Sequence, residues 1–187
     1  MTHFGMQVVE RMNELKILID LAHASDLTIQ DALQISKTPC CSTHDCCQAI
    51  SGNPRCKSDA VLRAIADRGG VIGIHAIPNI LSREPDQGIE DVLRNIDHAV
   101  EVAGIDSVAV GTDTFFGDHV GMHRKILESV SLGRELQTFP ASYMKGIENP
   151  GDFPNVMRGL VKRRYTDDEI QKIIGRNALR VFEEVVG

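Results

Sequence analysis

Strand-length apolar runs alternate along this chain with segments that carry apolar residues at helical spacing. Four runs are predicted to be β-strands: residues 16–21, the segment opened by Thr38-Pro39, residues 71–74 and residues 107–111. These runs are continuously apolar rather than alternating, which is typical of parallel strands covered on both faces. The succession of strands and helices therefore predicts an α/β fold built on a parallel sheet.

The clearest predicted helix covers about residues 89–103, where apolar positions recur three and four residues apart and Gly104 closes the helix. Polar N-cap residues mark the start of the other helices. The predicted caps are Thr2, Ser25, Ser58 and Thr166, the last in a capping box with Glu169, and residues 177–186 form the final helix.

At 187 residues the chain is long enough for one domain with a substantial core. Four strand–helix units are half of the eight that a closed β/α barrel needs, so we expect residues 1–187 to form a single, partial (β/α) barrel domain. A long segment, residues 112–155, follows the last strand, with one helix predicted around residues 125–136. A connection of this length is usually functional, as a lid or an oligomer contact.

Polar side chains stand at or just past the ends of these runs. The residues are His23, His44, His75 and Asp113. In a β/α barrel the carboxyl ends of the parallel strands meet at one edge and build the active site. This pattern favours an enzyme, or a large piece of one.

His23 and His44 lie 21 positions apart, which is one strand–helix unit and would bring the two imidazoles side by side. Neutral imidazoles are good zinc ligands, although a catalytic zinc needs at least three protein ligands plus water. Either histidine alone is equally compatible with a hydrogen-bonded loop residue. Their matched positions favour the metal-ligand hypothesis.

Asp113 and Arg55 are further candidates. A carboxylate at Asp113 could ligate a metal or transfer a proton, although an isolated aspartate is more often a turn or cap residue. Arg55 lies in the loop after His44, where its guanidinium could bind a substrate carboxylate through two parallel hydrogen bonds. The alternative for Arg55 is an ordinary surface arginine.

The formal net charge of −6 and the absence of a Lys/Arg block exclude a nucleic-acid-binding footprint. No signal-peptide pattern and no membrane-span-length apolar stretch is visible. Five cysteines, an odd number without an export signal, favour reduced thiols and a cytoplasmic location. The cysteines of residues 40–47, with Cys56, could form a structural zinc site, but no CxxC pair exists and small buried hydrophobes are the preferred interpretation.

At these residues the chain resembles the membrane (renal) dipeptidase family, the zinc peptidases of family M19. The matching segments include LIDLAHAS at residues 18–25, STH at 42–44, NPR at 53–55, GGVIGI at 69–74, VAGID at 102–106, GTD at 111–113 and GRNALRV at 175–181. The resemblance covers essentially the whole chain. It implies the C-terminal half, about four βα units, of a TIM-like metal-dependent hydrolase barrel.

By this resemblance, His23 and His44 hold one zinc of a binuclear pair, Arg55 binds the free carboxylate of a dipeptide and Asp113 transfers the proton. His75 stands where the family usually has Asn, and we assign it to substrate binding. A metal-bound hydroxide would attack the peptide bond. The family's first-strand His-x-Asp pair and its bridging glutamate have no counterpart here, and we expect that half of the barrel to precede Met1.

The function predicted is therefore the C-terminal half of a zinc dipeptidase that is inactive alone. The expected partners are a dipeptide substrate and either the N-terminal half or further copies of this chain in a homo-oligomer. One alternative is a non-catalytic remnant that acts as a binding or oligomerisation module. Another is an independent Cys/His zinc-binding module.

Overall fold

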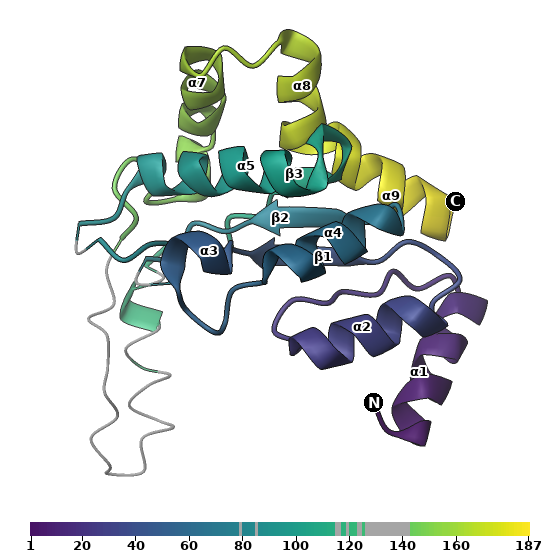
Figure 1. Ribbon diagram of the computed structural model, residues 1–187. Helices are drawn as coiled ribbons and strands as arrows, with labels where there is room; N and C mark the ends of the chain where they lie inside the picture. Colours follow the sequence, from purple (N-terminus) through teal and green to yellow (C-terminus); the bar gives the residue numbers. More distant parts are fainter. Residues whose placement is uncertain (79, 85, 115–116, 119, 123–124, 126–142) are drawn as a thin grey trace.

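The computed structural model describes residues 1–78, 80–84, 86–114, 117–118, 120–122, 125 and 143–187 (Figure 1). The α-helices are α1 (His3–Glu14), α2 (Asp26–Ile35), α3 (Gln48–Ser51), α4 (Asp59–Asp67), α5 (Ile89–Ala103), α7 (Pro154–Lys162), α8 (Asp167–Gln171) and α9 (Asn177–Val186). The strands are β1 (Cys41–Asp45), β2 (Val71–Ile74) and β3 (Val108–Val110). Three short helices are η1 (Ile105–Ser107), η2 (Pro150–Asp152) and η3 (Lys172–Arg176).

The three strands form one parallel sheet in the order β1-β2-β3, as the continuous apolar runs predict. The first predicted strand, residues 16–21, is not a strand in the structure. It instead forms one parallel bridge, in which Asp20 pairs with Cys41 at the outer edge of β1. The Cys41 N–H donates to Ile19 O (2.9 Å) and the Leu21 N–H donates to Cys41 O (2.7 Å).

Asp20 explains why this pairing stops after one bridge. Its Oδ1 atom accepts the backbone N–H groups of Ala22 and Thr43, each at 3.0 Å. The Thr43 N–H is the donor that the next backbone hydrogen bond between this segment and β1 would need, and it donates to the Asp20 side chain instead. Residues 16–21 still lie beside β1, at the place in the sheet that the sequence predicts for them.

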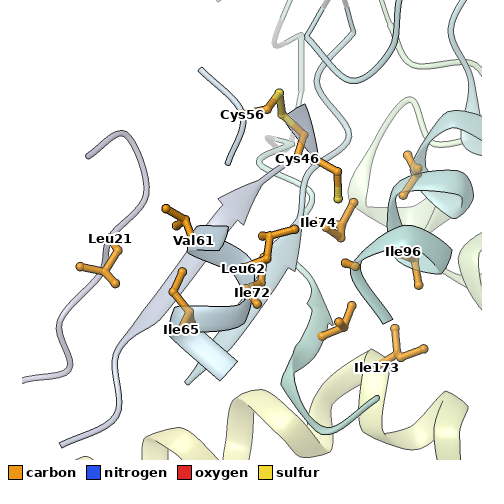
Figure 2. Close-up of a cluster of buried hydrophobic side chains, with 14 of the residues drawn as sticks. Leu21, Cys46, Cys56, Val61, Leu62, Ile65, Ile72, Ile74, Ile96 and Ile173 are labelled. Atoms are coloured by element: carbon orange, nitrogen blue, oxygen red, sulfur yellow. A yellow bond between two sulfur atoms is a disulfide. The ribbon is translucent and has the colours of Figure 1, made fainter. Parts of the chain in front are cut away.

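One face of the sheet packs against helices. Leu62 and Ile65 of α4 and Ile96 of α5 meet Ile72 and Ile74 of β2 in a continuous core (Figure 2). All five side chains are fully buried. Each contributes roughly 1.5–3 kcal/mol relative to an exposed position.

The other face of the sheet is lined by small side chains and is only partly covered. Cys41, Val71 and Ala109 pack there against Val181 and Val185 of α9. A hollow of about 510 Å³ lies between this face and α9, and its lining includes the half-exposed side chains of Leu179 and Phe182. In a closed barrel this face would point to the interior.

β1 contains a bulge near its carboxyl end, at Thr43 and His44. Ser42 pairs with Ile72 and Asp45 with Ile74, so Thr43 and His44 stand opposite a single residue, Gly73. The Thr43 carbonyl oxygen lies so close to the neighbouring strand that a Cβ atom added at Gly73 would be 2.1 Å from it. At Gly111 the corresponding distance would be 1.8 Å, so only glycine fits at these two positions.

The predicted helix starts agree with the structure. Thr2, Ser25 and Thr166 cap α1, α2 and α8 with their side chains, and Glu169 closes the capping box at Thr166. Ser58 does precede α4, but its hydroxyl donates to Asp26 Oδ2 (2.7 Å) and makes no capping hydrogen bond. The side chain therefore ties α4 to α2 instead of capping its own helix.

The C-terminal helices α7 and α8 stand over α5 (Figure 1), and α9 returns to the sheet. Within the predicted long segment, residues 112–155, the structure describes a parallel bridge between Gly88 and Lys145. The helix predicted around residues 125–136 lies, beyond Lys125, outside the described residues. No helix in the described ranges is long and apolar enough to cross a membrane.

Candidate active site

Two histidines meet where the sheet ends. His23 follows the segment beside β1 with a left-handed backbone (φ 64°), and His44 lies near the carboxyl end of β1. Their Nε2 atoms are 2.9 Å apart, and the ring centroids are separated by 4.9 Å with planes tilted by 59°. The structure thus places His23 and His44 side by side, as their separation of 21 positions in the sequence predicts.

The tautomer of His44 follows from its neighbours. The Thr43 hydroxyl donates its one proton to Asp20 Oδ2 (2.6 Å), because an ionised carboxylate only accepts hydrogen bonds. The 2.8 Å contact between Thr43 Oγ1 and His44 Nδ1 must then be donated by the imidazole. In neutral His44 the proton is therefore on Nδ1, and Nε2 presents a lone pair toward His23.

Asp20 supports this arrangement, and the sequence pattern does not single it out. Burial raises the pKa of Asp20, but the hydrogen bonds from Thr43 and Ala22 outweigh this and hold the pKa below its ordinary value. An ionised Asp20 keeps the Thr43–His44 contact oriented. Its sequence signal is a single acidic residue inside an apolar run, three positions before a histidine.

Electrostatics around His23 favour the neutral ring. Burial lowers the pKa of His23, and the positive charge of Arg55 and the neighbouring His44 act in the same direction. The carboxylates of Asp113 and Asp45 oppose this effect, so both act on the imidazole. A neutral imidazole is the form that binds a metal ion.

Asp113 lies just past β3 on a left-handed backbone (φ 56°), and its side chain is exposed. The loop that carries it is tied to the end of β2, because the Ala76 N–H donates to Thr112 O (2.9 Å). The exposed Asp113 carboxylate is close enough to His23 to act on its pKa. This placement is compatible with proton transfer.

Arg55 reaches the same edge of the sheet from the loop after α3. Its Nη1 atom donates to Asp45 Oδ1 (2.9 Å) and its Nη2 atom to the His44 carbonyl (3.2 Å). Its side chain is 22% exposed, so the guanidinium is neither an ordinary surface group nor sealed in the core. The two buried charges behind it, Asp45 and Lys57, are also not singled out by the sequence pattern.

His75, at the end of β2, is 1% exposed. Its Nδ1 atom accepts the Ile77 N–H (3.0 Å), so the ring proton is on Nε2. Within the described residues this Nε2 atom has no hydrogen-bond partner. Burial, with the charge of Arg55, lowers the pKa of His75 to about 3. A buried donor without a partner is costly, and a bound ligand could satisfy it.

Within the part of the chain that the structure describes, the cysteines do not form a metal site. Cys46 and Cys56 are joined in a disulfide with Cα atoms 4.8 Å apart, so the prediction that all five thiols are reduced is wrong for this pair. The loop that carries Cys56 returns beside β1, where the Lys57 N–H donates to Cys46 O (2.9 Å). The interpretation of the cysteines as buried side chains is confirmed, because all five are buried.

Three cysteines remain free in the structure: Cys40, Cys41 and Cys47. Burial raises the pKa of both Cys41 and Cys47 to about 12, which leaves these thiols protonated near neutral pH. Among the described residues, no group of three or more His, Cys, Asp or Glu side chains is placed to hold a metal ion. The His23–His44 pair is therefore an incomplete ligand set in this part of the chain.

A family model described as membrane dipeptidase (peptidase family M19) matches residues 1–138 and 127–186. Among solved structures, an amidohydrolase from Pseudomonas aeruginosa is similar over 100% of this chain and 58% of its own, with TM-score 0.90 and 30% identity. A metallo peptidase from Rhodobacter sphaeroides, liganded with a phosphinate mimic of the dipeptide L-Ala-D-Ala, matches over 98% and 47%, with TM-score 0.79 and 24% identity.

The probable dipeptidase PvdM from Pseudomonas aeruginosa matches over 99% of this chain and 54% of its own, with TM-score 0.81 and 22% identity. The chain thus spans about half the length of these solved structures. They confirm the predicted fold class, an α/β arrangement that corresponds to half of a TIM-like barrel.

Proposed function

This chain belongs to the membrane dipeptidase family, peptidase family M19, and we propose that it supplies the His23–His44 half of a metal-dependent active site that hydrolyses dipeptides. The observation that carries the proposal is the pair of Nε2 atoms at 2.9 Å, with the lone pair of His44 fixed by Thr43 and Asp20. A histidine held by a second hydrogen-bonded group in this way is typical of a metal ligand.

The distance between the two nitrogens fits a shared metal ion. Two histidine ligands of one tetrahedral zinc lie about 3.3 Å apart when each Zn–N bond is about 2.0–2.1 Å. His23 and His44 reach this separation from 2.9 Å by a shift of roughly 0.4 Å. The proposed metal is zinc, with the family's first-strand His-x-Asp pair and bridging glutamate completing a binuclear site.

When bound, zinc supplies polarisation of a peptide carbonyl and acidification of water. The other groups of this chain bind and orient the substrate. Arg55 uses two of its five N–H donors within the described structure, which leaves three that can bind the free carboxylate of a dipeptide. His75 offers its Nε2 proton to a polar substrate atom, and Asp113 holds and moves the proton that must reach the leaving amine.

The small-residue face of the sheet supports a second part of the proposal, that this chain works in an assembly. The hollow of about 510 Å³ beside Val71, Gly73 and Ala109 is apolar, and Leu179 and Phe182 stand half-exposed at it. An open parallel sheet with an apolar inner face needs covering strands. We assign this role to the complementary half-barrel, supplied by a separate segment or by another copy of this chain.

Metal binding tests the proposal directly. Cobalt(II), titrated into the chain and followed by visible absorption and calorimetry, should bind at one weak site that His23→Ala or His44→Ala abolishes. Thr43→Val should weaken binding by about 10–100-fold, because it removes the acceptor for the His44 Nδ1 proton. Thr43→Ser keeps the hydroxyl and is the matched control.

Two results would contradict the proposal. No cobalt binding at millimolar concentration would favour a non-catalytic binding module. A tight site that survives His23→Ala would indicate an independent Cys/His module. Hydrolysis of a dipeptide after addition of a half-barrel that carries His-x-Asp then measures the proposed activity.

A further inference from the structure

Behind Arg55 lie a negative charge, Asp45, and a second positive charge, Lys57, and both are buried away from any ligand. The Asp45 side chain is 0% exposed and the Lys57 side chain is 2% exposed. The Lys57 Nζ atom lies 3.4 Å from Asp45 Oδ2 and donates to the Ala24 carbonyl at 2.7 Å. A lysine buried to this degree is rare unless it is paired, because removing an ammonium from water is costly.

The acceptor capacity of Asp45 is fully used. Oδ1 accepts from Arg55 Nη1 (2.9 Å) and from the Cys46 N–H (3.3 Å). Oδ2 accepts from the Ser42 hydroxyl (2.6 Å) and faces the Lys57 ammonium. Asp45 is therefore fixed in place, and it fixes one edge of the Arg55 guanidinium.

The three groups together carry two positive charges and one negative charge. Lys57 and Asp45 balance each other inside the protein, so the surplus positive charge belongs to Arg55, whose side chain alone is partly exposed. Without Lys57, the buried carboxylate would neutralise Arg55 and weaken its attraction for an anion. Lys57 thereby determines whether the guanidinium acts as a charged receptor or as half of a neutral pair.

A covalent bond holds this arrangement in place. The disulfide joins Cys46, which follows Asp45, to Cys56, which lies between Arg55 and Lys57. Two backbone hydrogen bonds, from Lys57 N to Cys46 O and from Gln48 N to Lys57 O (both 2.9 Å), run beside it. The guanidinium is thus preorganised before any ligand binds, which lowers the entropic cost of binding.

We propose that Asp45 and Lys57 are positioning and specificity-determining residues for Arg55, and that Lys57 neutralises Asp45 so that Arg55 keeps a full charge for a carboxylate ligand. The proposal rests on the proposed function in one respect, that Arg55 contacts the substrate carboxylate. A purely structural role for Lys57 would change folding stability and leave anion affinity unchanged. Anion affinity is therefore the decisive quantity.

The test is an acetate titration of the full-length, metal-free chain at constant ionic strength. The readout is the Arg55 Nε–Hε signal in a ¹H–¹⁵N correlation spectrum, assigned with Arg55→Lys. Lys57→Met should weaken acetate binding by about tenfold, because it removes a charge close to the guanidinium in a poorly hydrated site. Lys37→Met removes the same charge from an exposed position and should change the affinity by less than about twofold.

The double variant Asp45→Asn/Lys57→Met removes one charge of each sign and should restore the wild-type affinity. Asp45→Asn alone should bind acetate more tightly than the wild type, and this variant keeps the test decisive if Lys57→Met does not fold. The proposal is overturned if Lys57→Met binds acetate as tightly as the wild type or if the double variant does not recover the wild-type acetate affinity. It is also overturned if the wild-type Arg55 Nε–Hε signal does not shift on addition of acetate. Because acetate binding needs neither metal nor catalysis, a chain that lacks dipeptidase activity can still pass or fail this test.

Discussion

Lowering the pH from 7 to 5 should destabilise this chain through one buried side chain, His75. Burial and the charge of Arg55 lower the pKa of His75 to about 3. A second proton would have to go on Nδ1, which already accepts the Ile77 N–H, so protonation breaks that hydrogen bond. In the unfolded chain the same imidazole titrates near its ordinary value of about 6.5.

Acid lowers the free energy of unfolding because the unfolded chain binds more protons than the folded chain. Between pH 6.5 and pH 3 the unfolded chain binds a proton that the folded chain does not, so acid favours unfolding. The stabilisation is fully present above the unfolded-state pKa and is lost as the pH falls toward the folded-state value of about 3. Linkage with these two pKa values gives a loss of about 2 kcal/mol in the free energy of unfolding between pH 7 and pH 5.

Urea unfolding at the two pH values measures this loss, followed by far-ultraviolet circular dichroism because the chain has no tryptophan. His75→Asn should remove about 2 kcal/mol of the pH difference, since Asn can still accept the Ile77 N–H but does not titrate. His3→Asn, at an exposed position of α1, is the matched control and should keep the wild-type difference. An unchanged pH difference in His75→Asn would refute the reasoning.

Three further predictions concern the strand ends and the chemistry. Gly73→Ala should destabilise the fold by about 1–3 kcal/mol in urea unfolding, because its Cβ would meet the Thr43 carbonyl, whereas Gly175→Ala, with open space around it, should be nearly neutral. The isolated chain should show no dipeptide hydrolysis in a zinc-supplemented assay, and turnover of roughly 1–1000 per second would contradict this. In an assembly completed with the missing ligands, Asp113→Asn should lower kcat by about 100-fold or more at unchanged zinc content, while Arg55→Ala should mainly raise KM.

The sequence pattern predicts the strands of the sheet, and its one wrong strand, residues 16–21, has a physical explanation. Residues 71–74 and 107–109 are buried, and burial is what a continuous apolar run reports. The run 16–21 is also mostly apolar, but it contains Asp20, whose side chain takes the Thr43 N–H that further pairing with β1 would need. Competition between a side chain and the backbone leaves no trace in the hydrophobic pattern.

The candidate site divides in the same way. His23 and His44 could be paired from sequence because strand ends share one edge of a sheet. Asp45 and Lys57 could not, because their ion pair depends on how the loop after α3 folds back, and such a loop has no periodic signal. The Cys46–Cys56 disulfide is also not predicted from the sequence. An odd number of cysteines shows that at least one is unpaired within the chain, but it does not show which two lie close together.

The bulge in β1 connects these features to the chemistry. Inserting an extra residue before Asp45 lets Thr43 turn toward Asp20 while His44 turns toward His23. It also pushes the Thr43 carbonyl across the neighbouring strands, where Gly73 and Gly111 leave room for it. Gly73, Gly111 and Asp20 therefore all allow the same feature. They let β1 bend at the position where the His44 imidazole presents its lone pair. Residues far apart in the chain are coupled through that bend, and a change at either glycine should disturb the His44 side chain before it disturbs the helices.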